Sequence, residues 1–167
     1  MKKFLLFTLT LTVAHIITYY VFGALAYELL TKQFYLGENP TFLFMRTESD
    51  PLLWQHAMAW MFPGQALRGI LMALALLPFM KTLVDMGVVK RALALALLYF
   101  VFSHLSAAGP TTSNIEGFIY FRPEYFNARI FLLTQPEIIF QALGLGFCFS
   151  LLINIKGVGR QFDPVAK

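Results

Sequence analysis

Four long runs of apolar residues dominate the chain, over about residues 4–30, 65–84, 92–108 and 130–155. At 1.5 Å per residue, a helix of about 20 residues crosses a hydrocarbon core of about 30 Å. None of the runs alternates with period two, and in lipid only helices or closed barrels satisfy every backbone group. The pattern therefore predicts an all-α integral membrane protein. We expect an antiparallel four-helix transmembrane bundle that forms a single domain over residues 1–167.

A shorter helix is predicted in the polar segment between the first two runs. Asp50 is a typical N-cap residue and Pro51 suits the first helical position, while Pro63 and Gly64 predict the end of the helix. Two tryptophans between these signals favour the membrane–water interface, where an indole lies half in water. We expect an interfacial helix at about residues 51–62, in the first outer loop.

Composition agrees with a membrane protein. Hydrophobic residues make up 58% of the chain, charged residues 13%, and mean hydropathy is +0.66, whereas soluble domains are about a quarter charged. The net charge of +4 comes from the ends and the middle of the chain, because the residues in and beside the two long polar segments are net negative. This distribution follows the positive-inside rule and does not indicate a nucleic-acid surface. It predicts that both termini are cytoplasmic. The short loops and the Lys2-Lys3 start suit a bacterial inner membrane.

The first run also resembles a secretory signal peptide. It follows two lysines, and Ala24-Leu25-Ala26 matches a cleavage site. The apolar run is far longer than the 7–15 residues of a signal-peptide core, however. We therefore expect the segment to be retained as the first membrane span.

Small residues at helical spacing predict close helix packing. The fourth run carries Ala142, Gly146 and Ser150 at i, i+4 and i+8. Such residues let helix backbones approach each other, which favours association in lipid. They predict packing within the chain or, as an alternative, a homo-oligomer or a place in a larger membrane complex. The single cysteine, Cys148, excludes an intramolecular disulfide.

Each apolar run places one ionisable residue near its predicted outer end. These residues are Glu28, Arg68, His104 and Glu137. Counted along the helices, all four lie within roughly 10 Å of the outer boundary. Because buried charges are costly in a membrane, each should face protein or water. Together with Gln141, one turn below Glu137, they predict an outward-facing polar pocket in which Arg68 opposes Glu28 or Glu137.

A purely structural role is the alternative for these residues. Arg68 and the two glutamates would then form ion pairs that tie the helix ends together. Glu137 follows Pro136 and is also a candidate for a helix start, where the helix dipole stabilises an anion. In the second polar segment, Glu116 and Arg122 are candidates for a lid over the pocket. The alternative there is an ordered loop anchored by its aromatic residues.

The histidines allow two weaker hypotheses. His15 and His104 lie at similar heights, which permits a bis-histidine heme b between the first and third spans, with Arg68 or Arg129 near the propionates. A metal site from His56, His104, Glu116 and Glu137 has suitable ligand types, but no spaced ligand motif supports it. No phosphate-binding, dinucleotide-binding or nucleophile-elbow motif is present.

Three classes of function remain. The first is a membrane protein whose pocket binds, or transports, a lipid head group or a small polar solute. Its pocket residues are Glu28, Arg68, His104, Glu116, Arg122, Glu137 and Gln141. The second is an accessory or assembly subunit in which these residues are structural. The third is an intramembrane enzyme with His104 and Glu137 as an acid–base pair.

Overall fold

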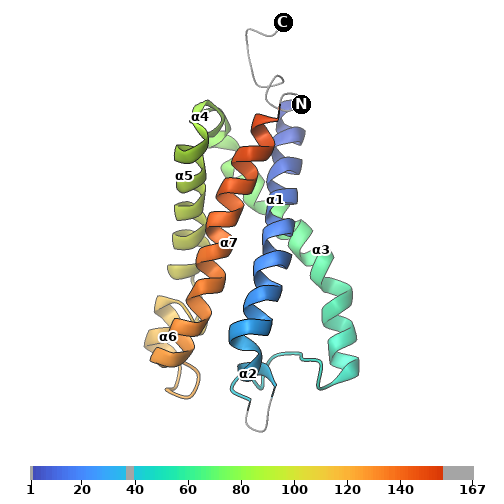
Figure 1. The fold of residues 1–167 in the computed structure, drawn as a ribbon, viewed down its shortest axis with the longest axis vertical. Helices are drawn as coiled ribbons and strands as arrows, with labels where there is room; N and C mark the ends of the chain where they lie inside the picture. Colours follow the sequence, from blue (N-terminus) through green and yellow to red (C-terminus); the bar gives the residue numbers. More distant parts are fainter. Residues whose placement is uncertain (1, 37–39, 156–167) are drawn as a thin grey trace, which may run out of the picture.

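The computed structural model describes residues 2–36 and 40–155, and every regular element in them is a helix (Figure 1). Four helical segments are long and apolar enough to cross a membrane: Lys2–Tyr35, Pro51–Asp85, Val88–Leu105 and Ala128–Asn154. The all-α prediction with four apolar spans is confirmed. The basic tail beyond residue 155 lies outside the described residues.

The first segment is longer than the sequence predicted. It comprises α1 (Lys2–Ala26), a π-helical turn (Tyr27–Thr31) and α2 (Lys32–Tyr35). At the turn, the Thr31 hydroxyl donates to the carbonyl of Ala26, five residues earlier, over 3.3 Å. The helix therefore continues past the predicted end at residue 30.

The second segment begins as predicted but does not break where predicted. The Asp50 carboxylate accepts hydrogen bonds from the next two available backbone amides, at 3.0 and 3.1 Å, and Pro51 opens α3. The expected end at Pro63-Gly64 is wrong, since α3 continues to Leu76. A single proline removes only one N–H bond, and a helix in apolar surroundings retains the remaining ones. After α3, the residues Leu77–Phe79 around Pro78 form a 3-10 turn before α4 (Met80–Asp85).

The third and fourth segments lie close to their predicted positions. The third is α5 (Val88–Phe100), followed by a π-helical turn (Val101–Leu105), and it starts four residues before the predicted bound of 92. A short helix, α6 (Ile115–Tyr120), lies in the following loop, and α7 (Ala128–Asn154) forms the fourth segment. Pro136 lies inside α7, so Glu137 is not at a helix start and that expectation is wrong.

Helix α1 packs between α3 and α7, and α5 packs on the other side of α7. Helices α3 and α5 make only sparse contact with one another. Toward its Pro51 end, α3 diverges from α1, as Figure 1 shows. We call the two ends of the molecule the α4 end, where α1 also begins, and the α6 end.

Glycines set the closest helix crossings. A Cβ added at Gly69 of α3 would lie 2.9 Å from the Cα of Thr12 on α1. At the α5–α7 crossing, a Cβ on Gly146 would collide with the backbone carbonyl of Ala92. The small residues identified in the sequence therefore pack within the chain. The core between the crossings is apolar and contains Phe7, Leu11, Leu95, Leu145 and Phe149.

Candidate functional site

Three of the four predicted ionisable residues are similarly far along their helical segments from the α4 end. Arg68 is 17 residues before Asp85, His104 is 16 residues after Val88, and Glu137 is 17 residues before Asn154. These separations correspond to about 24–26 Å from the α4 end of each segment. Glu28 is 26 residues beyond Lys2, about 39 Å along the helix, and so lies further from that end. These counts do not put the first three residues at one height. Gly69, next to Arg68, packs on Thr12 of α1, whereas Glu137 faces Gly23, further along α1.

Arg68 reaches across the gap between α3 and α5. Its Nη2 donates to the hydroxyl of Ser103 over 3.3 Å, and its guanidinium carbon lies 5.8 Å from the centre of the Tyr99 ring. It is also within electrostatic range of both His15 and His104. In the described part of the chain, no carboxylate lies within 4.0 Å of Arg68. Its charge is therefore held by a hydroxyl and an aromatic ring, without an ion pair.

His104 lies in the π-helical turn that ends the third segment. Its Nε2 is buried and has no hydrogen-bond partner among the described residues. The ring lies 6.3 Å from that of Phe100, and the Ser113 backbone lies beside it. The Ser113 carbonyl in turn accepts a hydrogen bond of 2.9 Å from Gln135 on α7.

His15 is engaged by a partner that the sequence did not indicate. Its Nε2 lies 3.1 Å from Oε1 of Gln65 on α3, and the ring centres of Tyr19 and Tyr99 are each 6.2 Å away. The residue is 1% exposed. Gln65 was expected at the start of a helix, and only the continuation of α3 through Pro63 brings it beside α1. The hydrogen bond occupies the nitrogen that a heme iron would require.

Glu137 pairs with an amide and not with Arg68. Its Oε1 accepts a hydrogen bond of 2.9 Å from Nε2 of the buried Gln141. Gly23 of α1 faces the pair, because a Cβ added there would lie 3.6 Å from each partner. The predicted Arg68–Glu137 opposition is therefore not a direct ion pair. Tyr19 and Tyr99 are within electrostatic range of both residues.

The remaining predicted site residues lie elsewhere. Glu28 is exposed and bonds to Lys32 at 2.9 Å, one turn along, so the predicted Arg68–Glu28 pair is wrong. Arg122 is exposed and forms an ion pair of 2.9 Å with Glu124. Glu116 lies, partly buried, in the first turn of α6. These residues are not brought together with Arg68 as a lid would require.

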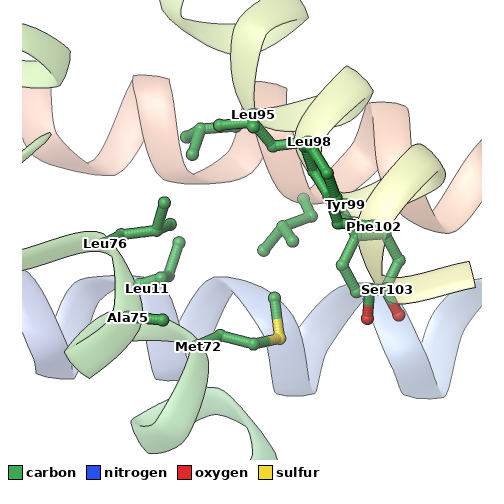
Figure 2. Close-up of a pocket in the computed structure, with 10 residues that line it drawn as sticks. Leu11, Met72, Ala75, Leu76, Leu95, Leu98, Tyr99, Phe102 and Ser103 are labelled. Carbon is green, nitrogen blue, oxygen red and sulfur yellow. The ribbon is translucent and has the colours of Figure 1, made fainter. Parts of the chain in front are cut away.

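A groove of about 300 Å³ lies between α3 and α5 (Figure 2). Leu11 and Leu145, from α1 and α7, also line it. The hydroxyls of Tyr99 and Ser103 lie at one end, and leucines line the other (Figure 2). These two residues are also the ones that Arg68 contacts. The groove is thus apolar along its length and adjoins a cation at its polar end.

Two further pockets are separate from this groove. One, of about 240 Å³ between α1 and α7, is lined by Glu137 among apolar side chains. The other, of about 570 Å³, lies beneath α6 and is lined largely by phenylalanines. The single pocket predicted from the sequence is therefore divided, with Arg68 and Glu137 beside different cavities.

The most deeply buried charge was missed by sequence reasoning. Arg91, in the first turns of α5, is 1% exposed. Its guanidinium donates to the carbonyls of Leu83 and Val84 at the end of α4, to both oxygens of Ser150, and to Asn154. Carbonyls at a helix C-terminus carry partial negative charge, which stabilises a cation there. Arg91 therefore fastens the α4 end of the structure and is not a loop residue exposed to water.

No group of three or more histidine, cysteine, aspartate or glutamate side chains placed to hold a metal ion occurs within the described residues. The chain matches no protein-family model, and no curated protein or solved structure is significantly similar to it.

Proposed function

We propose that this chain is a multi-pass membrane protein that binds an anionic group at Arg68, on a lipid head group or a small polar solute. The observation that carries the proposal is the guanidinium held between α3 and α5 by one hydroxyl and one ring. Among the described residues it has no carboxylate within 4.0 Å. Arg68 is exposed on a segment that is apolar enough to span a membrane. A charge there is costly in a bilayer, and an anion is the partner that offsets the cost.

The neighbouring groups suit an oxyanion. A guanidinium presents five N–H donors in a planar fork, which matches carboxylate and phosphate oxygens. Ser103 and Tyr99 add two hydroxyls beside it. A bound anion would accept from these donors together.

Our proposal for the membrane arrangement follows the charge pattern. The α4 end faces the cytoplasm of a bacterial inner membrane, and both termini lie there, because the lysines at positions 2, 3, 81 and 90 gather at that end. The four segments form an antiparallel bundle, and the first turns of α3, over residues 51–62, lie at the outer interface. Labelling of single cysteines at Lys3 and Thr112, in a Cys148→Ser background, tests this arrangement. A membrane-impermeant maleimide should label intact cells only at position 112.

Thermal unfolding in neutral detergent tests the anion site. Inorganic phosphate, added against chloride at constant ionic strength, should raise the unfolding midpoint of the wild-type protein. A ligand at 100 times its Kd stabilises by about 2.7 kcal/mol, or roughly 5–10 °C for a chain of this size. Arg68→Gln should abolish the rise.

Arg129→Gln is the matched control. Arg129 also donates to a neutral side chain, Gln33, at 2.6 Å and lies 6.0 Å from an aromatic centre, that of Phe34. It lies at the start of α7, beyond the α3–α5 gap. This variant should respond to phosphate as the wild type does. An equal phosphate response in Arg68→Gln would refute the proposal.

The second candidate function is an accessory subunit of a larger membrane complex. It is favoured by the Pro51 half of α3, which diverges from α1 and carries exposed Met58, Trp60 and Phe62. His104→Ala and Glu137→Ala separate the two functions. If both variants lose only thermal stability while every cellular phenotype is retained, the polar residues are structural and the accessory role is preferred.

A further inference from the structure

The groove between α3 and α5 and the Arg68 cluster form one continuous surface. Tyr99 and Ser103 line the polar end of the groove, and both contact Arg68. From this end the groove extends toward the α4 end, past Met72 and Leu95. Figure 2 shows the two hydroxyls at one end and leucine side chains at the other. A ligand that used both parts would have one polar end and one apolar chain.

The groove opens between two helices that pack on their neighbours but barely on each other. Its wall residues Leu98 and Phe102 are 37% and 70% exposed. In a bilayer this opening faces acyl chains, and an apolar space of this size does not stay empty when chains can enter it. Its volume of about 300 Å³ holds roughly ten methylene-sized groups at about 30 Å³ each, the volume of a water molecule in the liquid. It is therefore sized for one chain and too small for a helix, whose diameter is about 10 Å.

The donors at the polar end distinguish among head groups. Besides the guanidinium, the hydroxyls of Ser103 and Tyr99 lie at this end of the groove. A phosphate has more acceptor oxygens than a carboxylate and is the better match for several donors at once. A neutral alcohol would leave the charge of Arg68 without an anion.

We infer that the ligand is a phosphate-headed lipid that enters sideways from the bilayer, with its phosphate at Arg68 and one acyl chain in the α3–α5 groove. This inference rests on the proposed function, because it assigns the anionic group to a lipid. It adds a binding site for the acyl chain, which binding of an anion at Arg68 does not require.

Three probes separate head group from chain: inorganic phosphate, dodecyl phosphate and dodecanol. Each is titrated into the full-length protein in neutral maltoside micelles, the two amphiphiles at matched mole fractions, and the unfolding midpoint is measured. We expect dodecyl phosphate to bind about tenfold more tightly than inorganic phosphate, equivalent to about 1.4 kcal/mol. Dodecanol should have little effect, since the micelle offers its chain an equally apolar site.

Substitutions distinguish the binding site of the phosphate from that of the acyl chain. Ala75, on the groove wall, is replaced by phenylalanine, and Ala59→Phe, at another exposed alanine of α3 outside the groove, is the matched control. Ala75→Phe should bring dodecyl phosphate binding down to the level of inorganic phosphate and leave the phosphate response intact. Arg68→Gln should remove both responses, and Ala59→Phe neither. A retained phosphate response also shows that Ala75→Phe has folded.

The outcomes test the lipid ligand separately from the anion site on which it depends. The lipid inference is overturned, and the ligand is a solute, if phosphate binding depends on Arg68 but dodecyl phosphate binds no more tightly than inorganic phosphate. The same conclusion follows if Ala75→Phe does not weaken the binding of dodecyl phosphate. Dodecanoate, titrated in the same way, compares a carboxylate with a phosphate on the same chain. If it binds as tightly as dodecyl phosphate, the phosphate assignment is overturned. If neither anion depends on Arg68, the proposed function itself fails.

Discussion

Nη2 of Arg91 donates a hydrogen bond of 2.7 Å to Oδ1 of Asn154, and so joins the start of α5 to the end of α7. Hydrogen bonds to charged groups contribute about 1.5–3 kcal/mol each. We predict that Asn154→Leu lowers the free energy of unfolding by about 2 kcal/mol, because it leaves one guanidinium donor of a buried cation without this partner. Unfolding by SDS in mixed micelles measures the change. A loss of less than about 0.5 kcal/mol would show that Arg91 does not depend on this bond.

Gly146 and Gly64 provide a paired test of helix packing. Gly146→Ala places a methyl group against the Ala92 carbonyl at the α5–α7 crossing, and overpacking of this kind costs about 1–3 kcal/mol. Gly64→Ala, in α3, meets nothing within 4 Å and should gain roughly 0.5–1 kcal/mol from the better helix propensity of alanine. Thermal unfolding should therefore shift in opposite directions. A shift in the same direction for both variants would contradict the observed crossing.

The His15–Gln65 hydrogen bond predicts a non-additive pair of substitutions. Gln65→Leu leaves the Nε2 of buried His15 without its partner, and His15→Phe does the same to the Gln65 amide. Each change should cost about 1–3 kcal/mol, whereas replacing both polar partners should cost clearly less than the sum. Unfolding of the two single variants and the double variant gives the coupling energy. Additive costs would show that the two side chains do not interact.

Asn114 organises the loop between α5 and α7. Its Oδ1 accepts from the amides of Thr111 and Gly117 at 2.9 and 2.8 Å, and its Nδ2 donates to the carbonyls of Ala107 and Gly109. We predict that Asn114→Ala increases hydrogen exchange at residues 109–120, and that Asn114→Asp, which keeps only the acceptor, has an intermediate effect.

Asn127→Ser is the control for this loop experiment. Asn127 caps α7 through a bond of 3.1 Å to the Ile130 amide, and serine is also a good N-cap residue. Exchange at residues 109–120 should stay at the wild-type level in this variant. Wild-type exchange in Asn114→Ala would mean that the loop does not depend on its buried amide.

Local signals in the sequence predicted the helices well, because they act over a few residues. The Asp50-Pro51 start and the four apolar helical segments follow from such signals. The break at Pro63-Gly64 was predicted on the same grounds and failed. In an apolar environment one lost hydrogen bond costs less than ending the helix and exposing several backbone groups.

The candidate site depended on relationships that the sequence does not contain. The position of each of Arg68, His104 and Glu137 along its own helix was predictable. Their relative heights were not, because α3 crosses α1 at an angle that residue counts do not include. The partner of each residue was not predictable either, because it depends on how the helices rotate and which of them touch. The Glu28–Lys32 pair was an exception in principle, since its i, i+4 spacing alone favours it. The α3–α5 groove arises from two helices that do not pack together, which periodicity cannot reveal.

Native mass spectrometry of the protein released from neutral detergent tests the anion site most directly. We predict that wild type and Arg129→Gln retain one anionic species per chain, whether lipid or solute, and that Arg68→Gln loses most of it. Recovery of every variant as a folded chain, judged by circular dichroism, makes the comparison valid. Equal occupancy in Arg68→Gln and wild type, or an empty site in both, would contradict the assignment of Arg68 as the anion-binding residue.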